Sequence, residues 1–374
     1  MTPAPLQRHW RAMLYVNAAV MLGVFLYKLN LQPYVPYIHL LVDYHFGFIK
    51  RALIGAVVAL FTDKVSVWLV YAIGGCVWLI TAGLFIRLFH KTFGFSDESL
   101  PLFVFTAGSP FFLKNFIFAL GHFDIYGALA AIILLLVPAR SLAIVWLATV
   151  LSALLILIHH IHLLMYVPTM TAIVVLRYYL TKGATRLNVA VGVAALLGLG
   201  ALFLAAQFLG TMPIPHDEFV RYLQSKMADP SRTALLQFAY IWYQPLSKEL
   251  QDTWARMPSN LLGVPVYALL LWLHAPLWRF FAATVRALAD IWHRRIVLAA
   301  IGVISLAYLV MFAMVFDYSR WLSSWVVCMI LLLHAVKTLP AIAVVPLIPN
   351  EDRKTARLGW IVTALPRVGI IRPF

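Results

Sequence analysis

The sequence holds only two cysteines, Cys76 and Cys328, among its 374 residues. Both lie inside long apolar runs, where a thiol packs as a small apolar side chain. Two isolated cysteines do not form a disulfide framework, and no second cysteine or histidine stands at zinc-ligand spacing beside either of them. We therefore interpret both as packing residues.

Charged side chains are also scarce. They make up 11% of the chain, whereas 63% of the residues are hydrophobic. A soluble protein of this length cannot hide so much apolar surface, because its interior grows too slowly with chain length. In lipid, backbone amides must be paired within the spanning structure, so spans are α-helices or strands of closed barrels. Because the apolar runs are continuous rather than alternating, we expect an all-α, polytopic transmembrane helix bundle.

The apolar runs predict about ten spans, all within a single integral membrane domain over 1–374. They cover about 12–29, 66–88, 101–119, 125–139, 141–158, 163–179, 187–208, 261–279, 296–315 and 322–337. Pro138 and the three-residue link 139–141 predict a tight hairpin between the fourth and fifth segments.

The formal charge of +15 has the sign of a nucleic-acid-binding protein, but its distribution favours another explanation. With the N-terminus inside, the inner segments carry a strong excess of lysine and arginine, whereas the outer segments are nearly balanced. Membrane proteins collect basic residues in their cytoplasmic loops. The pattern predicts an N-in/C-in, multi-pass protein of a bacterial cytoplasmic (inner) membrane, with 338–374 as a cytoplasmic tail and no nucleic-acid partner.

Two expected outer segments are too long to be simple turns. The first, 30–65, begins with Pro33 and Pro36 and has an apolar middle, which predicts a pair of interfacial helices. The second, 210–260, is the most polar stretch and contains five prolines and the aromatic patch 238–243. It predicts a small extracytoplasmic cap of short helices.

Four polar clusters fall on links that this topology places outside. They are Asp43–Arg51, Gly121–Asp124, His159–His162 and Phe316–Trp321. Helix capping and interfacial anchoring explain any one of them. Together they favour a substrate or ion site, because acidic, imidazole and cationic groups are costly at membrane depth.

The first cluster predicts chemistry on a phosphate leaving group. Asp43 stands near the paired cations Lys50 and Arg51. A carboxylate accepts the proton of an attacking hydroxyl, and cations stabilise the charge on a departing phosphate. We expect Lys114, in the 101–119 segment, and Arg320 to add to the cationic site.

The histidine run allows several interpretations. His159 and His162 are three residues apart and would share one helix face, as metal ligands do. The run lacks an HExxH motif, and no cysteine or carboxylate cluster supplies a third ligand. No metal site is assigned, although a divalent metal stays an open alternative as cofactor. The other interpretations are hydrogen bonding to sugar hydroxyls or lipid phosphate, and interfacial packing.

In layout, residues 1–180 resemble the GT-C superfamily of polytopic membrane glycosyltransferases, which use polyprenyl-phosphate-linked sugars. The resemblance rests on a first span with its N-terminus inside and on a following outer loop that carries Asp43-Tyr44 and Lys50-Arg51. It implies an essential acid at Asp43, with Asp124 in the next outer loop as its partner. The short first loop, the absence of a second acid beside Asp43 and the absence of a large C-terminal domain depart from the family pattern. These departures leave metal use and the acid/base assignment open.

The expected function is a hexosyl- or pentosyltransferase of cell-surface polysaccharide or glycolipid synthesis. It would act at the extracytoplasmic face on a polyprenyl-phosphate-sugar donor and a saccharide or lipid acceptor, among membrane lipids. The expected catalytic residues are Asp43 and Asp124, and the expected donor-phosphate ligands are Lys50, Arg51, Lys114 and Arg320. The expected sugar- and acceptor-binding residues are Tyr44, His122, His159, His160, His162, Asp317, Tyr240 and Trp242.

Other classes of function stay open. An O-antigen-type polymerase or ligase would rely on outer-loop arginines such as Arg221, Arg232 and Arg256. A transporter or flippase is less favoured, because charge is nearly absent from the middle of the spans and no repeat is visible. A non-enzymatic assembly factor is the remaining alternative.

Overall fold

The computed structural model describes residues 5–315, 317–340, 343 and 345–368. Within these ranges every regular element is a helix, and the only strand-like pairing is one bridge between Val65 and Met227. Five helices are long and apolar enough to cross a membrane, namely α1 (Pro5–Leu29), α4 (Trp68–Phe93), α12 (Arg186–Phe208), α17 (Ile291–Met314) and α18 (Tyr318–Val336). The all-α class is confirmed, whereas the count of about ten spans and their orientation stay predictions.

Two of the expected spans are broken. Segment 101–119 forms two short helices, α5 (Leu100–Thr106) and α6 (Leu113–Phe118), and the link between them contains Pro110. Segment 261–279 covers α15 (Val264–Leu273) and the start of α16 (Ala275–Arg286), and the axes of these two helices differ by 65°. If this bent pair crosses the membrane as one span, the number of candidate spans is six. The breaks fall near Pro110 and Pro276, each of which lacks the backbone donor that a continuous helix would use.

The remaining apolar segments form shorter helices. The predicted hairpin is confirmed as α7 (Asp124–Leu136) and α8 (Ala143–Ile158), which pack against each other. Segment 163–179 is divided among α9 (His162–Met165), α10 (Val167–Val174) and a π-helical turn over Val175–Tyr179, with α11 (Leu180–Lys182) after it. Helix α18 lies at the centre of the bundle. In its apolar stretch 83% of the residues are buried, compared with 11–33% in the other candidate spans. The other helices therefore surround α18.

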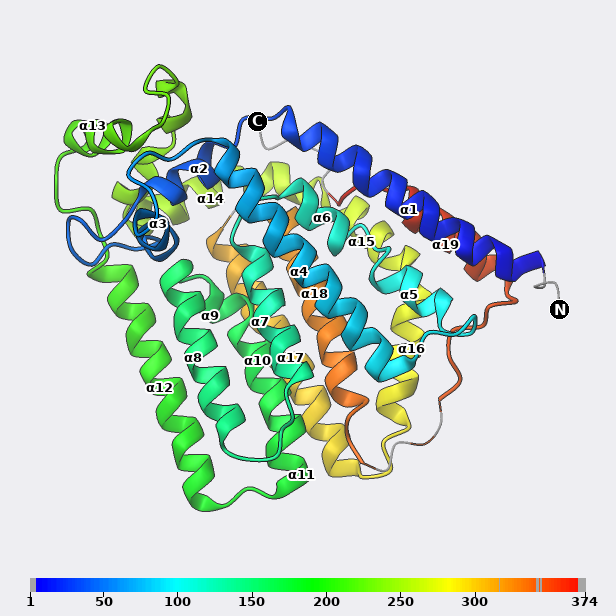
Figure 1. Cartoon of the computed structure of the whole chain (residues 1–374). Coiled ribbons are helices and arrows are strands. Elements are labelled where there is room, and N and C mark those ends of the chain that lie inside the picture. The colour runs from blue at the N-terminus through cyan, green and yellow to red at the C-terminus, as the bar shows by residue number, and fades with distance from the viewer. Residues whose placement is uncertain (1–4, 316, 341–342, 344, 369–374) are drawn as a thin grey trace.

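The helix α19 (Arg353–Ala364) runs beside α1, and both lie obliquely to the other long helices (Figure 1). Trp10 Nε1 donates to the Asn350 carbonyl at 2.9 Å, and a Cβ on Gly359 would lie 2.8 Å from the Trp10 ring. At the other end, the Arg367 guanidinium lies 3.8 Å from the centre of the Phe118 ring. The expected tail, as far as it is described, therefore packs along α1.

The two long outer segments form one structure, which we call the cap (residues 30–65 and 210–260). It contains α2 (Tyr34–Leu41), α3 (Leu53–Ala59), α13 (His216–Lys226) and α14 (Leu246–Leu261), so the predicted short helices are confirmed. Its segments share an apolar core, and the Tyr37 hydroxyl donates to the Val65 carbonyl at 2.6 Å. The cap covers the end of the bundle where α8 ends and α7 begins, and we call this end the site face (Figure 1).

Candidate functional site

An ion-paired arginine joins two distant segments at the site face. Arg320, in the first turn of α18, binds Asp124, the first residue of α7, through Nε at 2.8 Å and Nη2 at 2.9 Å. Arg320 Nη1 donates to Asp317 at 3.1 Å. The Asp124 side chain is only 4% exposed, so this fork-shaped pair lies largely out of water. Three expected site residues therefore meet, and Arg320 is a positive charge in a fixed position.

Arg51 is a second cation at the site face, and its backbone is strained. Its φ of 63° is the only positive φ of a non-glycine residue in the described part of the chain, and such strain persists only where the surroundings impose it. The preceding residue is held on both sides: Lys50 N donates to Gly210 O at 2.9 Å, and Trp242 Nε1 donates to Lys50 O at 3.0 Å.

The Nε atom of Arg51 is buried, and it has no hydrogen-bond partner among the described residues. Burial lowers the pKa of Arg51, the charge of Glu249 opposes this effect, and the positive charge of Arg320 adds to it. An arginine stays protonated in such surroundings. Arg51 therefore keeps both its charge and an unused donor.

Five histidines surround these two cations. They are His39, His122, His159, His160 and His162. His39 stacks on Phe123 with ring centres 4.2 Å apart, and the His159 ring lies 5.3 Å from that of His160. The loop before His122 packs closely against Gly74 of α4, because a Cβ atom on residue 74 would lie only 2.8 Å from the backbone nitrogen of Gly121.

All five imidazoles are neutral at pH 7. Burial is the main cause that lowers the pKa of each of them, and it brings the pKa of His162 to about 4. The charge of Arg51 further lowers the pKa of His39, His159 and His160, which shows that these rings lie near one guanidinium. A neutral imidazole offers one donor and one acceptor.

Several of these ring nitrogens are buried without a partner. Among the described residues, they are both nitrogens of His39 and Nδ1 of His160, whereas the His162 ring lies within reach of the Phe123 backbone. Leaving such a group unsatisfied costs about 1–3 kcal/mol, so a native protein pairs it with protein, water or ligand. Together with Arg51 Nε, they indicate a site built to receive a polar or anionic group.

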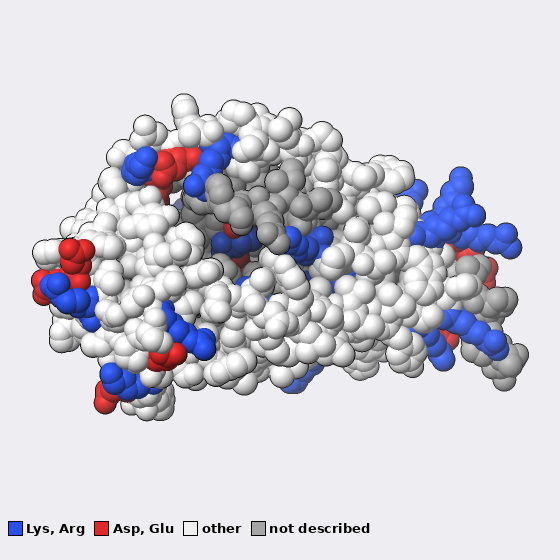
Figure 2. All heavy atoms as spheres, turned by 90° about the horizontal axis from the view of Figure 1, so that it is seen from above, with Lys and Arg blue, Asp and Glu red and all other residues white. Residues whose placement is uncertain are grey.

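Two lysines extend the cationic set. Lys50 Nζ lies 3.4 Å from the Gln244 carbonyl, and burial followed by the charge of Arg51 lowers its pKa. Lys28, at the end of α1, lies 5.8 Å from the centre of the Phe118 ring and is 7% exposed. Figure 2 shows this face of the molecule hollowed near its middle, with lysine and arginine side chains inside the hollow.

Asp43 belongs to a separate structure within the cap. Its carboxylate accepts from Lys226 Nζ at 2.7 Å, from the Tyr222 hydroxyl at 2.8 and 2.9 Å, and from the His45 amide at 3.0 Å. Burial raises the pKa of Asp43, but these hydrogen bonds outweigh burial and lower it below its usual value. A carboxylate held in this way is a weak base, so its geometry fits a cross-link between α13 and the first outer loop.

Two expected ligands are buried among other parts of the protein. Lys114 is fully buried, and its Nζ donates to the carbonyls of Val362 and Thr363 at 2.9 and 2.8 Å, so it anchors α19 instead of binding a phosphate. Trp242 is also fully buried and packs against His39 and Phe219, which leaves no face for a sugar. Tyr44 stacks beside Phe48, and Tyr240 is 44% exposed on the cap, so both stay accessible.

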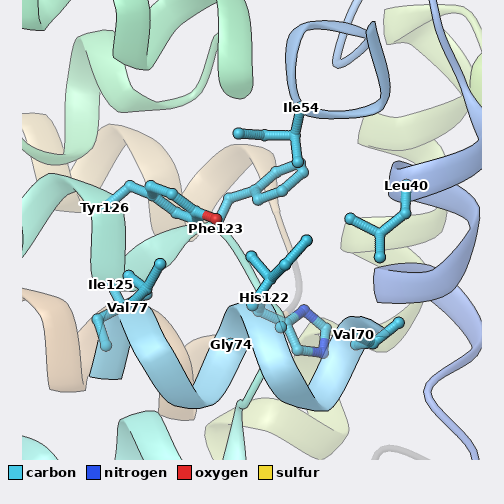
Figure 3. A pocket seen from close by; sticks show the side chains of 11 residues that line it. Leu40, Ile54, Val70, Gly74, Val77, His122, Phe123, Ile125 and Tyr126 are labelled. Atoms are coloured by element: carbon cyan, nitrogen blue, oxygen red, sulfur yellow. The ribbon is translucent and has the colours of Figure 1, made fainter. Parts of the chain in front are cut away.

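A narrow apolar cleft leads from α4 to His122. Leu40 and Ile54 of the cap face Val70 and Val77 of α4 across it (Figure 3). Its volume of about 10 Å³ has room for about one water molecule, so a sugar ring does not fit there. In the described part of the chain, no group of three or more His, Cys, Asp or Glu is placed to hold a metal ion.

Sequence reasoning missed several residues that define this site, among them His39, Glu249 and Lys226. The signal for His39 is an imidazole inside the otherwise apolar helix α2. Lys226 and Glu249 lie in an ordinary polar segment, so their sequence gives no such signal.

Comparison with known proteins identifies no relative: no protein-family model, no curated protein and no solved structure matches this chain.

Proposed function

We propose that the chain is a membrane glycosyltransferase that takes its sugar from a polyprenyl-phosphate-linked donor at the site face. The observation that carries this proposal is Arg51, near Arg320: its backbone is strained, and among the described residues its buried Nε and the ring nitrogens of His39 have no partner. A phosphate attached to a membrane lipid supplies the acceptor oxygens that these donors lack, and it reaches them at the depth where the spans end.

The same residues suit the charge changes of sugar transfer. As the bond between sugar and phosphate breaks, negative charge grows on the phosphate oxygen, and preorganised cations stabilise it. In this proposal Arg51 and Lys50 bind the phosphate. Arg320 contributes a fixed positive charge, because Asp124 and Asp317 hold it in place. The neutral imidazoles of His39 and His160 then hydrogen-bond the phosphate or the sugar hydroxyls.

The proposal includes the side of the membrane and the pathway. The site face would be extracytoplasmic in a bacterial cytoplasmic membrane, as the predicted N-in orientation requires. The acceptor would be a saccharide or lipid of cell-surface polysaccharide or glycolipid synthesis. Asp124 acts here through Arg320 as a positioning residue, and Lys114 and Trp242 have structural roles.

The test is a transfer assay with the full chain in lipid nanodiscs. Polyprenyl-phosphate-linked hexoses and pentoses, labelled in the sugar, are supplied with extracted envelope lipids and saccharides as acceptors. Wild-type protein should transfer label from at least one donor. Arg51→Gln should lower kcat/KM by about 100-fold or more, since it removes a charged donor at the departing phosphate.

The matched control is Arg221→Gln on the exposed face of α13, which should keep full activity. Thermal unfolding of each variant separates lost chemistry from lost fold, and Arg51→Lys should recover part of the activity. Absence of wild-type transfer with every donor, or full activity of Arg51→Gln, would overturn the proposal. Loss of activity in Arg221→Gln and Arg232→Gln with an active Arg51→Gln would favour the polymerase or ligase class.

A further inference from the structure

Sugar transfer to a hydroxyl needs a base, and three carboxylates near the site are already engaged. Asp43 is held by Lys226 and Tyr222 in the cap. Asp124 and Asp317 are both bound to Arg320. A general base must reach the proton that it removes with a free lone pair, so these three are poorly suited to that role.

Glu249 is placed differently. It lies in the first turn of α14, where its amide donates to Pro245 O at 3.2 Å. Lys50 Nζ lies 3.4 Å from the carbonyl of Gln244, the residue before that proline, so Lys50 reaches the start of α14. The negative charge of Glu249 acts on both Lys50 and Arg51. Glu249 is therefore at the edge of the proposed phosphate site.

The Glu249 carboxylate is also available for a substrate. It is only partly buried, and no Lys, Arg or His nitrogen in the described ranges lies within 4 Å of it. The helix that carries it is held firmly, because Thr253 Oγ1 donates to Met314 O at 2.9 Å and Trp254 Nε1 donates to Ala313 O at 3.1 Å. These two bonds hold α14 against α17, and the contact of Lys50 Nζ with the Gln244 carbonyl places the start of α14 beside Lys50.

We propose that Glu249 is the general base of the transfer, an inference that rests on the proposed function. Glu249 takes the proton of the acceptor hydroxyl while that oxygen forms a bond to the anomeric carbon of the sugar. The bond from this carbon to the phosphate oxygen breaks at the same time. Its electron pair leaves with the lipid phosphate, whose new charge is stabilised by Arg51 and Lys50.

The experiment compares Glu249→Gln with Asp252→Asn in the same nanodisc transfer assay. Asp252 is on the same helix and pairs with Lys248 at 2.8 Å, so it controls for the loss of one acid from α14. Glu249→Gln should lower kcat by about 10²–10⁴-fold, the usual contribution of a general base, with little change in the KM for the donor. The acidic limb of the pH–rate profile should disappear, while Asp252→Asn keeps both kcat and the limb.

A purely structural role would not move the pH profile. Glu249→Asp should recover part of kcat, since it restores a carboxylate at a shorter reach. If wild-type protein transfers sugar and Glu249→Gln keeps its kcat and its acidic limb, the assignment of the base is overturned and the proposed function stands. If wild-type protein transfers no sugar, the proposed function itself fails.

Discussion

The ion pair between Asp124 and Arg320 gives the strongest stability prediction. Asp124→Asn keeps the shape of the side chain but removes the negative charge opposite a guanidinium that is 24% exposed. Of the two hydrogen bonds at 2.8 and 2.9 Å, at most one remains, from the guanidinium to the neutral amide oxygen. Breaking a buried pair on one side costs about 3–5 kcal/mol. Because Asp317 still contacts Arg320, we expect about 3 kcal/mol.

The assay is reversible unfolding of the purified protein in mixed micelles, followed by tryptophan fluorescence. Asp229→Asn, in the exposed pair with Arg232, is the control and should leave stability unchanged. The double variant Asp124→Asn/Arg320→Met should be more stable than Asp124→Asn alone, because it no longer holds a guanidinium that has lost its buried carboxylate partner. Wild-type stability of Asp124→Asn, or simple additivity in the double variant, would refute the reasoning.

Three further predictions concern groups around the site. Asp43→Asn should destabilise the cap at pH 7 and make the stability of the protein less sensitive to acid. Folding lowers the pKa of Asp43. The stability that this carboxylate contributes is therefore present above about pH 4 and is lost as the pH falls through the pKa of the folded state. In the wild-type protein the buried His39 ring stays neutral while the ring in the unfolded chain protonates, so the free energy of unfolding falls as the pH drops from about 6.5 to 5. His39→Phe should reduce this fall by up to about 1.4 kcal/mol per pH unit. An unchanged dependence of the free energy of unfolding on pH would contradict this. Lys114→Met should loosen α19 and speed cleavage by trypsin after Arg353, Lys354 and Arg357, while the unfolding of the rest of the protein changes little. If the variant resists trypsin as well as the wild-type protein does, Lys114 does not anchor α19.

The helical class could be predicted from the sequence, as could the polar residues that lie at the site face. Long apolar runs require helices, and charged groups at their ends are expensive enough to be informative. Asp124 and Arg320 are 196 residues apart; both were expected in the site, but the ion pair between them was not predicted. The histidines and Arg51 also gather at the expected end.

What the sequence could not supply was the partner of each polar group. In the sequence, Lys114 and Lys50 are both lysines in apolar surroundings. In the fold, α19 runs along α1, and its backbone carbonyl at Val362 accepts a hydrogen bond from the Lys114 ammonium group. Asp43 is bound by Lys226 and Tyr222, which come from a segment almost 180 residues later. Glu249 is a candidate for the site only because the fold brings the start of α14 next to Lys50. Such pairings depend on how the cap folds, and local patterns do not encode them.

The central claim is that the site face binds a lipid-linked phosphate through Arg51. The most direct measurement is the affinity of a short-chain polyprenyl phosphate, and of the uncharged polyprenol, for wild-type and Arg51→Gln protein in nanodiscs. The account predicts that the wild-type protein binds the phosphate at least about tenfold more tightly than the alcohol, a difference of about 1.4 kcal/mol, and that Arg51→Gln loses this preference. Equal affinity for the two lipids, or an unchanged preference in Arg51→Gln, would contradict it.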